Sequence, residues 1–160
     1  MTAEKHLARK YLGFSLLVLT IMLCTACGAK LIRGESPMVR LKELSHQDDN
    51  ITLKLSMRNL NGVALDINNI DFSLSTDDKE LFSYHGPADT NIVANGTETW
   101  SVEVKESQAS RELLDSLQNG DVKSLPYELK GSVKSAEDGT LHFQHEGHLY
   151  PLPGRPGRFR

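Results

Sequence analysis

Three histidines late in the sequence are the first residues whose type and spacing could do chemistry. His142, His145 and His148 follow one another at intervals of three residues. Imidazole suits zinc and copper, but successive side chains of a strand point to opposite faces, so a strand would place His145 on the face opposite His142 and His148. All three could meet one ion only if the strand bulged, for example at Gly147. We predict no metal site, with weak binding by the His142/His148 pair as an alternative.

The patterns of common catalytic sites are missing from the sequence. It contains neither a Gly-x-Ser-x-Gly nucleophile elbow nor a glycine-rich phosphate loop, which are the sequence marks of serine hydrolases and of nucleotide-binding proteins. Adjacent acidic residues occur at 48–49, 77–78 and 137–138, but these stretches resemble turns, in which charged side chains are usually solvated. We therefore predict a protein that is not an enzyme and that uses no cofactor or small-molecule substrate.

The two cysteines, Cys24 and Cys27, follow an apolar run from Leu12 to Leu23. They are too few for a disulfide framework or a four-cysteine zinc site. Basic residues precede the run and small residues follow it, which is the plan of a secretory signal. The run has 12 residues, whereas a transmembrane helix needs about 20. We predict a cleaved signal over residues 1–26.

Residues 23–28, with the sequence LCTACG, resemble the lipobox of bacterial lipoproteins. The resemblance implies that Cys27 carries diacylglycerol and a further acyl chain such as palmitate, and that it becomes the mature N-terminus. Several acyl chains together hold a protein on a membrane durably. Gly28 stands where many lipoproteins retained at the inner membrane carry aspartate, which implies the periplasmic face of the outer membrane. An ordinary secretory signal with two incidental cysteines is the alternative.

Composition limits what the rest of the chain can be. The sequence has 160 residues, 39% of them apolar, with 18 Lys and Arg against 21 Asp and Glu. This length predicts one modest domain with accessory segments, and the lack of a dense basic block argues against nucleic-acid binding. Residues 27–36 are expected to form the lipidated N-terminus and a tether, residues 37–150 the domain and residues 151–160 a tail.

A period of two dominates the sequence after residue 50. Apolar residues alternate with polar ones over 51–58 and again over 63–74, which is typical of strands with one buried face. Shorter strands are expected at 81–84 and 92–93, and Asn95-Gly96 is a strong signal for a type I′ hairpin. Further strands are expected around Trp100, which we place in the core, and over 127–133 and 141–143. Seven or eight strands in all indicate an antiparallel β-sandwich.

Two segments depart from this pattern. Residues 107–119 place apolar side chains at helical spacing, with Ser107 or Ser110 as a cap and Gly120 as a stop, so we predict one helix there. The tail at 151–160 contains three prolines and two glycines, so we expect it not to continue a sheet. Its three arginines are expected to be solvated rather than to bind lipid head groups.

The strands resemble the water-stress and hypersensitive-response domain of the late embryogenesis abundant type 2 (LEA type 2) family, in its small bacterial lipoprotein form. The resemblance rests on the segments PMVRL at 37–41, ITLKLSMRNLN at 51–61, the stretch 65–74 and YELKGSV at 127–133. One difference is Leu60, which stands between Asn59 and Asn61 where the family often has proline. The resemblance implies an immunoglobulin- or fibronectin-like sandwich and a role in tolerating dehydration, without catalytic residues.

Three functions therefore remain open at this point. The first is a non-enzymatic lipoprotein that protects the envelope, with the membrane and unfolding envelope proteins as its partners. The second is an adaptor of an envelope assembly or transport complex, which would bind its partner through a sheet edge or face. A weak periplasmic metal binder is the third and least favoured possibility.

Overall fold

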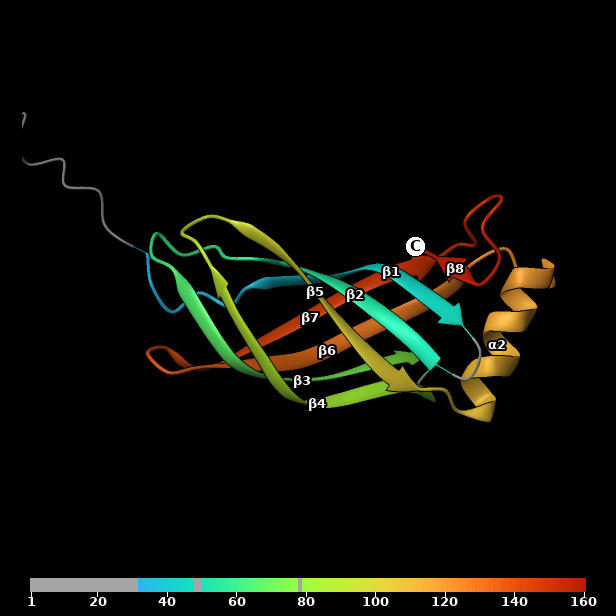
Figure 1. Ribbon diagram of the computed structural model, residues 1–160, viewed down its shortest axis with the longest axis horizontal. Helices are drawn as coiled ribbons and strands as arrows, with labels where there is room; N and C mark the ends of the chain where they lie inside the picture. Colours follow the sequence, from blue (N-terminus) through green and yellow to red (C-terminus); the bar gives the residue numbers. More distant parts are fainter. Residues whose placement is uncertain (1–31, 48–49, 78) are drawn as a thin grey trace, which may run out of the picture. The chain divides into compact units, whose positions relative to one another are not determined.

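The computed structural model describes residues 32–47, 50–77 and 79–160, and two four-stranded antiparallel sheets make up most of this part (Figure 1). The first sheet has the order β5-β2-β1-β8. Its strands are β1 (Met38–Gln47), β2 (Asn50–Arg58), β5 (Thr97–Lys105) and β8 (Arg158–Phe159). The second sheet has the order β4-β3-β6-β7. Its strands are β3 (Leu65–Thr76), β4 (Lys79–Ile92), β6 (Leu125–Ser135) and β7 (Gly139–Leu149). The predicted all-β sandwich with one short helix is confirmed for the described residues.

The core lies between the two sheets and is built from alternate residues of their strands. In β2 the side chains of Ile51, Leu53, Leu55 and Met57 are fully buried, while the residues between them are partly exposed. Residues of both sheets join one buried apolar cluster. Each large apolar side chain buried in this way contributes about 1.5–3 kcal/mol to stability, so the period of two seen in the sequence is also the main source of stability.

Two glycines make room for aromatic rings inside the second sheet. Gly131 pairs with Phe143 and Gly147 pairs with Tyr127 across β6 and β7. A Cβ added at Gly147 would lie 2.6 Å from the Tyr127 hydroxyl, and one added at Gly131 would lie 2.7 Å from the Phe143 ring. The rings therefore occupy the space that side chains would need at these glycines. Because β6 and β7 pair without a shift of register, Gly147 marks a packed ring and not the bulge that a three-histidine metal site would require.

The predicted helix is present as α2 (Gln108–Asn119). Ser107 is its N-cap, and its hydroxyl accepts the Ser110 backbone N–H while the Ser110 hydroxyl accepts the Ser107 N–H. Gly120 ends the helix with a φ of 83°, a conformation that costs glycine little. The helix buries Leu114 and Leu117, so both caps and the apolar side of the helix were predictable from the sequence.

One long strand, β4, takes the place of the two short strands expected at 81–84 and 92–93, so that expectation was wrong. It runs without interruption from Lys79 to Ile92 and includes Pro87. Proline removes a backbone donor, which a strand tolerates at the edge of a sheet, and β4 is an edge strand. The pairing with β3 shifts in register beside Pro87, between Ile67 and Asn69. This shift accommodates the backbone donor that proline lacks.

The turn at Asn95-Gly96 is not a type I′ hairpin. The Gly96 N–H donates to the Val93 carbonyl at 2.9 Å, so Ala94 and Asn95 are the central residues of the turn. Only Asn95 of this turn has a positive φ, 56°, as in a type II turn. The turn leads from β4 in the second sheet to β5 in the first, where β5 pairs with β2. The dipeptide predicted a turn correctly but could not show which strands would pair.

The C-terminal tail also departs from expectation, because part of it forms a strand. Arg158 and Phe159 form β8, which pairs with Ser45 and Leu44 of β1. Phe159 is only 1% exposed and belongs to the core. The prolines and glycines lie before β8, where the chain turns back toward β1. The turn brings Phe159 to a position where its ring is buried. Trp100, expected in the core, is partly buried against it.

Candidate functional site

Three surface hollows lie over the outer face of the second sheet. Because partners in neighbouring strands share a face, the register places polar residues in rows across this face. One row consists of Glu80, Ser75, Glu128 and Glu146. Another consists of His85, Asp71, Ser132 and His142. Hollows of about 400, 680 and 270 Å³ lie over these rows, so this face is the first place to look for a site.

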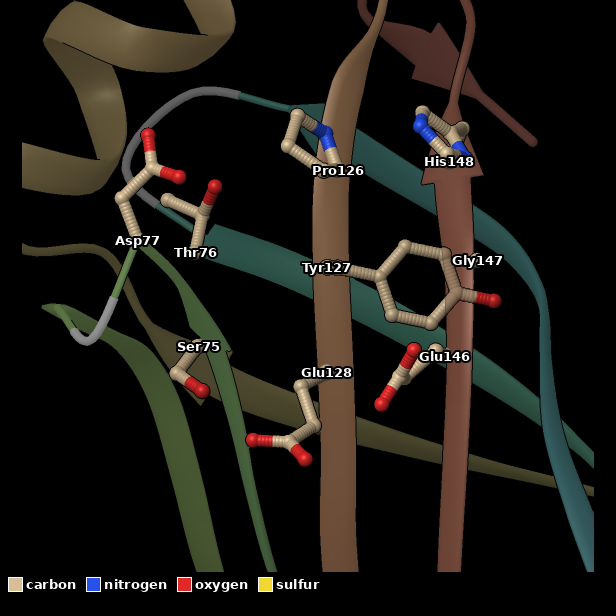
Figure 2. A pocket seen from close by; sticks show the side chains of 9 residues that line it. All are labelled: Ser75, Thr76, Asp77, Pro126, Tyr127, Glu128, Glu146, Gly147 and His148. Carbon is tan, nitrogen blue, oxygen red and sulfur yellow. The ribbon is translucent and has the colours of Figure 1, made fainter.

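The hollow in Figure 2 lies where β3 ends, beside the first residues of β6 and the last of β7. Glu128 and Glu146 are direct partners on neighbouring strands, and like charges in this position repel each other. The Lys130 ammonium lies 2.7 Å from the Glu128 carboxylate, and the Gln144 amide donates to it at 2.7 Å. These two contacts offset the repulsion, so the carboxylates form part of a compensated surface network.

Thr76 and Asp77 form the end of this hollow near the β3–β4 turn (Figure 2). Thr76 is 4% exposed, and its hydroxyl has no hydrogen-bond partner among the described residues. The hydroxyl is itself almost inaccessible, so a ligand in the hollow could not reach it without a movement of the turn. Burial raises the pKa of Tyr127, and the Arg40 charge opposes that shift. The hollow can therefore offer exposed carboxylates to a polar molecule, but it holds no activated nucleophile.

The pair His85 and Asp71 is the arrangement on this face that comes nearest to catalytic geometry. Their Nδ1 and Oδ2 atoms are 2.8 Å apart, which is how an acid orients an imidazole in a serine-protease triad. The side chains are 78% and 63% exposed, however, and no described serine hydroxyl bonds to the ring. Sequence reasoning missed this pair because it depends on the register of β3 and β4. The pair is a solvated surface contact of small energetic value.

The histidines of β7 lie as the strand period predicts. His142 and His148 are exposed on the outer face, and His145 is half-buried on the inner side. His148 lies six residue steps along a regular strand from His142, which is about 20 Å at 3.3 Å per step, so the two histidines cannot bind one ion together. Among the described residues no group of three potential ligands is close enough for a metal. Burial lowers the pKa of His145, the Arg40 charge adds to this, and Glu146 opposes it.

The end of the sandwich that receives the N-terminal segment is held together by two buried asparagines. Asn59 and Asn61 are 0% and 1% exposed. The Asn59 amide donates to the carbonyls of Val63, Ile92 and Val93, and its oxygen accepts two hydrogen bonds from Asn61.

Asn61 in turn fixes the N-terminal segment. Its oxygen accepts the Glu35 N–H at 2.8 Å and its amide donates to the Glu35 carbonyl at 2.9 Å. The Gly62 N–H donates to the Ile32 carbonyl at 2.9 Å, and Arg33 forms ion pairs with Glu137 and Asp138. The segment expected to be a tether at 27–36 is thus bound to the domain from residue 32 onward.

At the opposite end, Glu43 of β1 holds β8 in place. The Arg158 guanidinium donates to its carboxylate through Nε at 3.0 Å, and Lys54 lies 3.7 Å away. The hydrogen bond from Arg158 lowers the pKa of Glu43, with the charges of Lys54 and Arg158 adding to the shift and burial opposing it. The tail arginine that was expected to be solvated is thus paired.

The predicted lipidation site, Cys27, lies outside the described residues, as do the signal segment and Asp78. Within the described ranges, none of the helical structure has the length and apolar character that a membrane span requires.

No curated protein matches the sequence. A similar solved structure from Archaeoglobus fulgidus shares 13% identity over 77% of this chain and 98% of that chain, with a TM-score of 0.42. One from Arabidopsis thaliana shares 14% identity over 81% and 95%, with a TM-score of 0.48. The solution structure of a proposed late embryogenesis abundant (LEA) protein shares 18% over 94% and 91%, with a TM-score of 0.43.

The family comparison is the decisive one. The sequence model described as "Late embryogenesis abundant protein" matches residues 54–147. This range begins within β2 and ends within β7, so it includes β3, β4, β5, the helix and β6, together with most of β7. The match spans more than half of the 160 residues, and the chain therefore belongs to the late embryogenesis abundant protein family.

Proposed function

We propose that this LEA-family protein is a non-enzymatic lipoprotein, anchored through Cys27 on the periplasmic face of the bacterial outer membrane, that protects the envelope and its proteins during water loss. The observation that carries the proposal is the lipobox-like sequence LCTACG at 23–28 directly before a domain of this family. Acylation at Cys27 would place the domain beside a bilayer, because the chain is bound to the domain again at Ile32.

The outer face of the second sheet supports a protective role. Its rows of carboxylates, hydroxyls and imidazoles present many hydrogen-bonding groups, with no deep apolar cavity among the hollows over them. Such a surface forms weak, reversible contacts with polar groups and keeps its hydration layer. These are the contacts that a protective protein needs when clients or head groups lose water.

The anchor is tested by labelling the native protein with radioactive palmitate in its bacterial host. Wild type should be labelled and found in the membrane fraction, and globomycin, which blocks lipoprotein signal cleavage, should cause the uncleaved form to accumulate. Cys27→Ala should abolish labelling, whereas the matched variant Cys24→Ala should keep it. A Cys27→Ala protein that is labelled and membrane-bound like wild type would show that the anchor is not at Cys27.

The protective role is tested with a deletion strain. We expect the strain to survive drying and osmotic shock less well than its parent, and the gene carrying Cys27 to restore survival. Equal survival, together with purified protein that does not protect a drying enzyme, would refute protection. Recovery of one stoichiometric partner by crosslinking would favour the adaptor function instead.

A further inference from the structure

Exposed apolar side chains are concentrated at one end of the sandwich. Among the described residues the large apolar side chains with high exposure are Ile32, Met38, Leu60, Val93, Val122 and Tyr150. Ile32 and Val93 are the most exposed of these, at 53% and 61%. Leu60 and Val93 lie in the loops β2–β3 and β4–β5, Ile32 is hydrogen-bonded to the first of these loops, and Met38 begins β1. Val122 follows α2 and Tyr150 follows β7. Figure 1 shows the loops β2–β3 and β4–β5 at the end of the sandwich opposite α2.

Three of these residues, Ile32, Leu60 and Val93, lie in segments that hydrogen bonds join to one another, and we call them the apolar tip. Gly62, close to Leu60, donates to the Ile32 carbonyl, and the Val93 carbonyl accepts from the Asn59 amide. The Asn59 N–H donates to the Gly96 carbonyl at 2.9 Å, which joins the two loops directly. The side chains are therefore presented by a rigid base, and the loops cannot easily fold inward to bury them.

The base also satisfies the polar groups beneath the tip. The buried amides of Asn59 and Asn61 are hydrogen-bonded to loop carbonyls and to each other, so these groups need no water when the tip is covered. Arg33, the nearest charge in sequence to Ile32, is paired with Glu137 and Asp138. The polar groups beneath the tip are thus already hydrogen-bonded within the protein. Transfer of the tip from water to an apolar environment therefore does not leave them unpaired, which keeps the free-energy cost of that transfer low.

We propose that the apolar tip docks into the surface of the bilayer that holds the N-terminal lipid. This inference rests on the proposed acylation of Cys27. Ile32 is the fifth residue after Cys27, and five residues reach at most about 18 Å at 3.6 Å each. The tip is thus the part of the described domain that is bound to stay near the anchor. Apolar side chains at the tip then enter the interfacial region, and the end that carries α2 faces away from the membrane.

The test places a tryptophan at the tip and a matched one at the far end. Leu60 and Val122 are 36% and 38% exposed, so Leu60→Trp and Val122→Trp are comparable reporters, each in a Trp100→Phe background. The full acylated protein is reconstituted in phosphatidylcholine vesicles with or without bromine on the acyl chains. Apolar groups at the interface lie about 5–10 Å into the boundary between head groups and acyl chains, within reach of brominated chains. We therefore expect bromine to reduce the fluorescence of Leu60→Trp at least about twofold and to leave Val122→Trp unchanged. Equal quenching at both positions, or none at Leu60→Trp, would overturn the proposal.

Two further measurements separate this inference from the proposed anchor. The mass of the purified chain shows directly whether Cys27 is acylated. If it is not, the anchor fails, and the same quenching experiment on the unacylated chain decides whether the tip still docks. Adding Val93→Ser to the Leu60→Trp chain should reduce quenching while leaving the mass unchanged. If the Trp100→Phe background does not fold, the reporters are placed in the native chain and its Trp100 signal is subtracted.

Discussion

Replacing Asn59 by alanine should destabilise the domain far more than its position in a loop suggests. The side chain is fully buried, its amide donates to three backbone carbonyls, and its oxygen accepts the Asn61 N–H at 2.9 Å. Alanine leaves the Asn61 N–H and at least one carbonyl unpaired, and each such buried group costs about 1–3 kcal/mol. Two such groups together predict a loss of about 2–6 kcal/mol in the free energy of unfolding, out of the roughly 5–15 kcal/mol typical of a domain.

Urea unfolding at constant m-value measures this loss, with Asn68→Ala as the control. Asn68 undergoes the same chemical change but is exposed on β3, so its substitution should change stability by less than about 0.5 kcal/mol. An Asn59→Ala protein that loses no more than Asn68→Ala would refute the argument that the asparagine network holds this end together. The same result would also contradict the claim that a rigid base presents the apolar tip.

Three other predictions concern the opposite end and the helix. Phe159→Ala should lower the free energy of unfolding by about 3–5 kcal/mol, measured by thermal or urea unfolding, because Phe159 is buried in the core. Tyr150→Ala, at a residue that is half-exposed, should lower it much less. Similar losses for the two variants would contradict the role of β8. Ser107→Ala should lower stability by about 1 kcal/mol through loss of the N-cap, and an unchanged unfolding midpoint would show that the capping box is dispensable. Because Arg158 lowers the pKa of Glu43, the stability from this pair should be present above pH 4.5, the ordinary value, and be lost as the pH falls through the lowered pKa. Glu43→Gln should therefore flatten the acid side of the stability profile, and an unaltered profile would argue against the coupling.

The parts of the structure that were predictable from the sequence are those set by local patterns. The alternation over 51–58 predicted β2 because one face of that strand is buried, and Ser107 and Gly120 predicted the limits of α2 because capping depends on nearby residues. The errors concern pairing between distant segments. Pro87 is tolerated in β4 only because that strand lies at an edge, and Phe159 forms β8 only because β1 has a free side beside it.

The same limit applies to the candidate site. The opposite faces of His142 and His145 followed from the strand period, but the approach of His85 to Asp71 depends on the register of two strands. The apolar tip combines Ile32, Leu60 and Val93 from three segments, and no local pattern links them.

The pairing of β8 with β1 has a consequence for the order of events during synthesis. Arg158 and its partner Glu43 are 115 residues apart, so the first sheet cannot be completed until nearly the whole domain has emerged from the ribosome. Until then β1 has an unpaired edge, and the space that Phe159 fills remains open. A chain shortened by a few residues at this end would keep that defect permanently, and we expect cellular proteases to degrade such a chain faster than the full-length one.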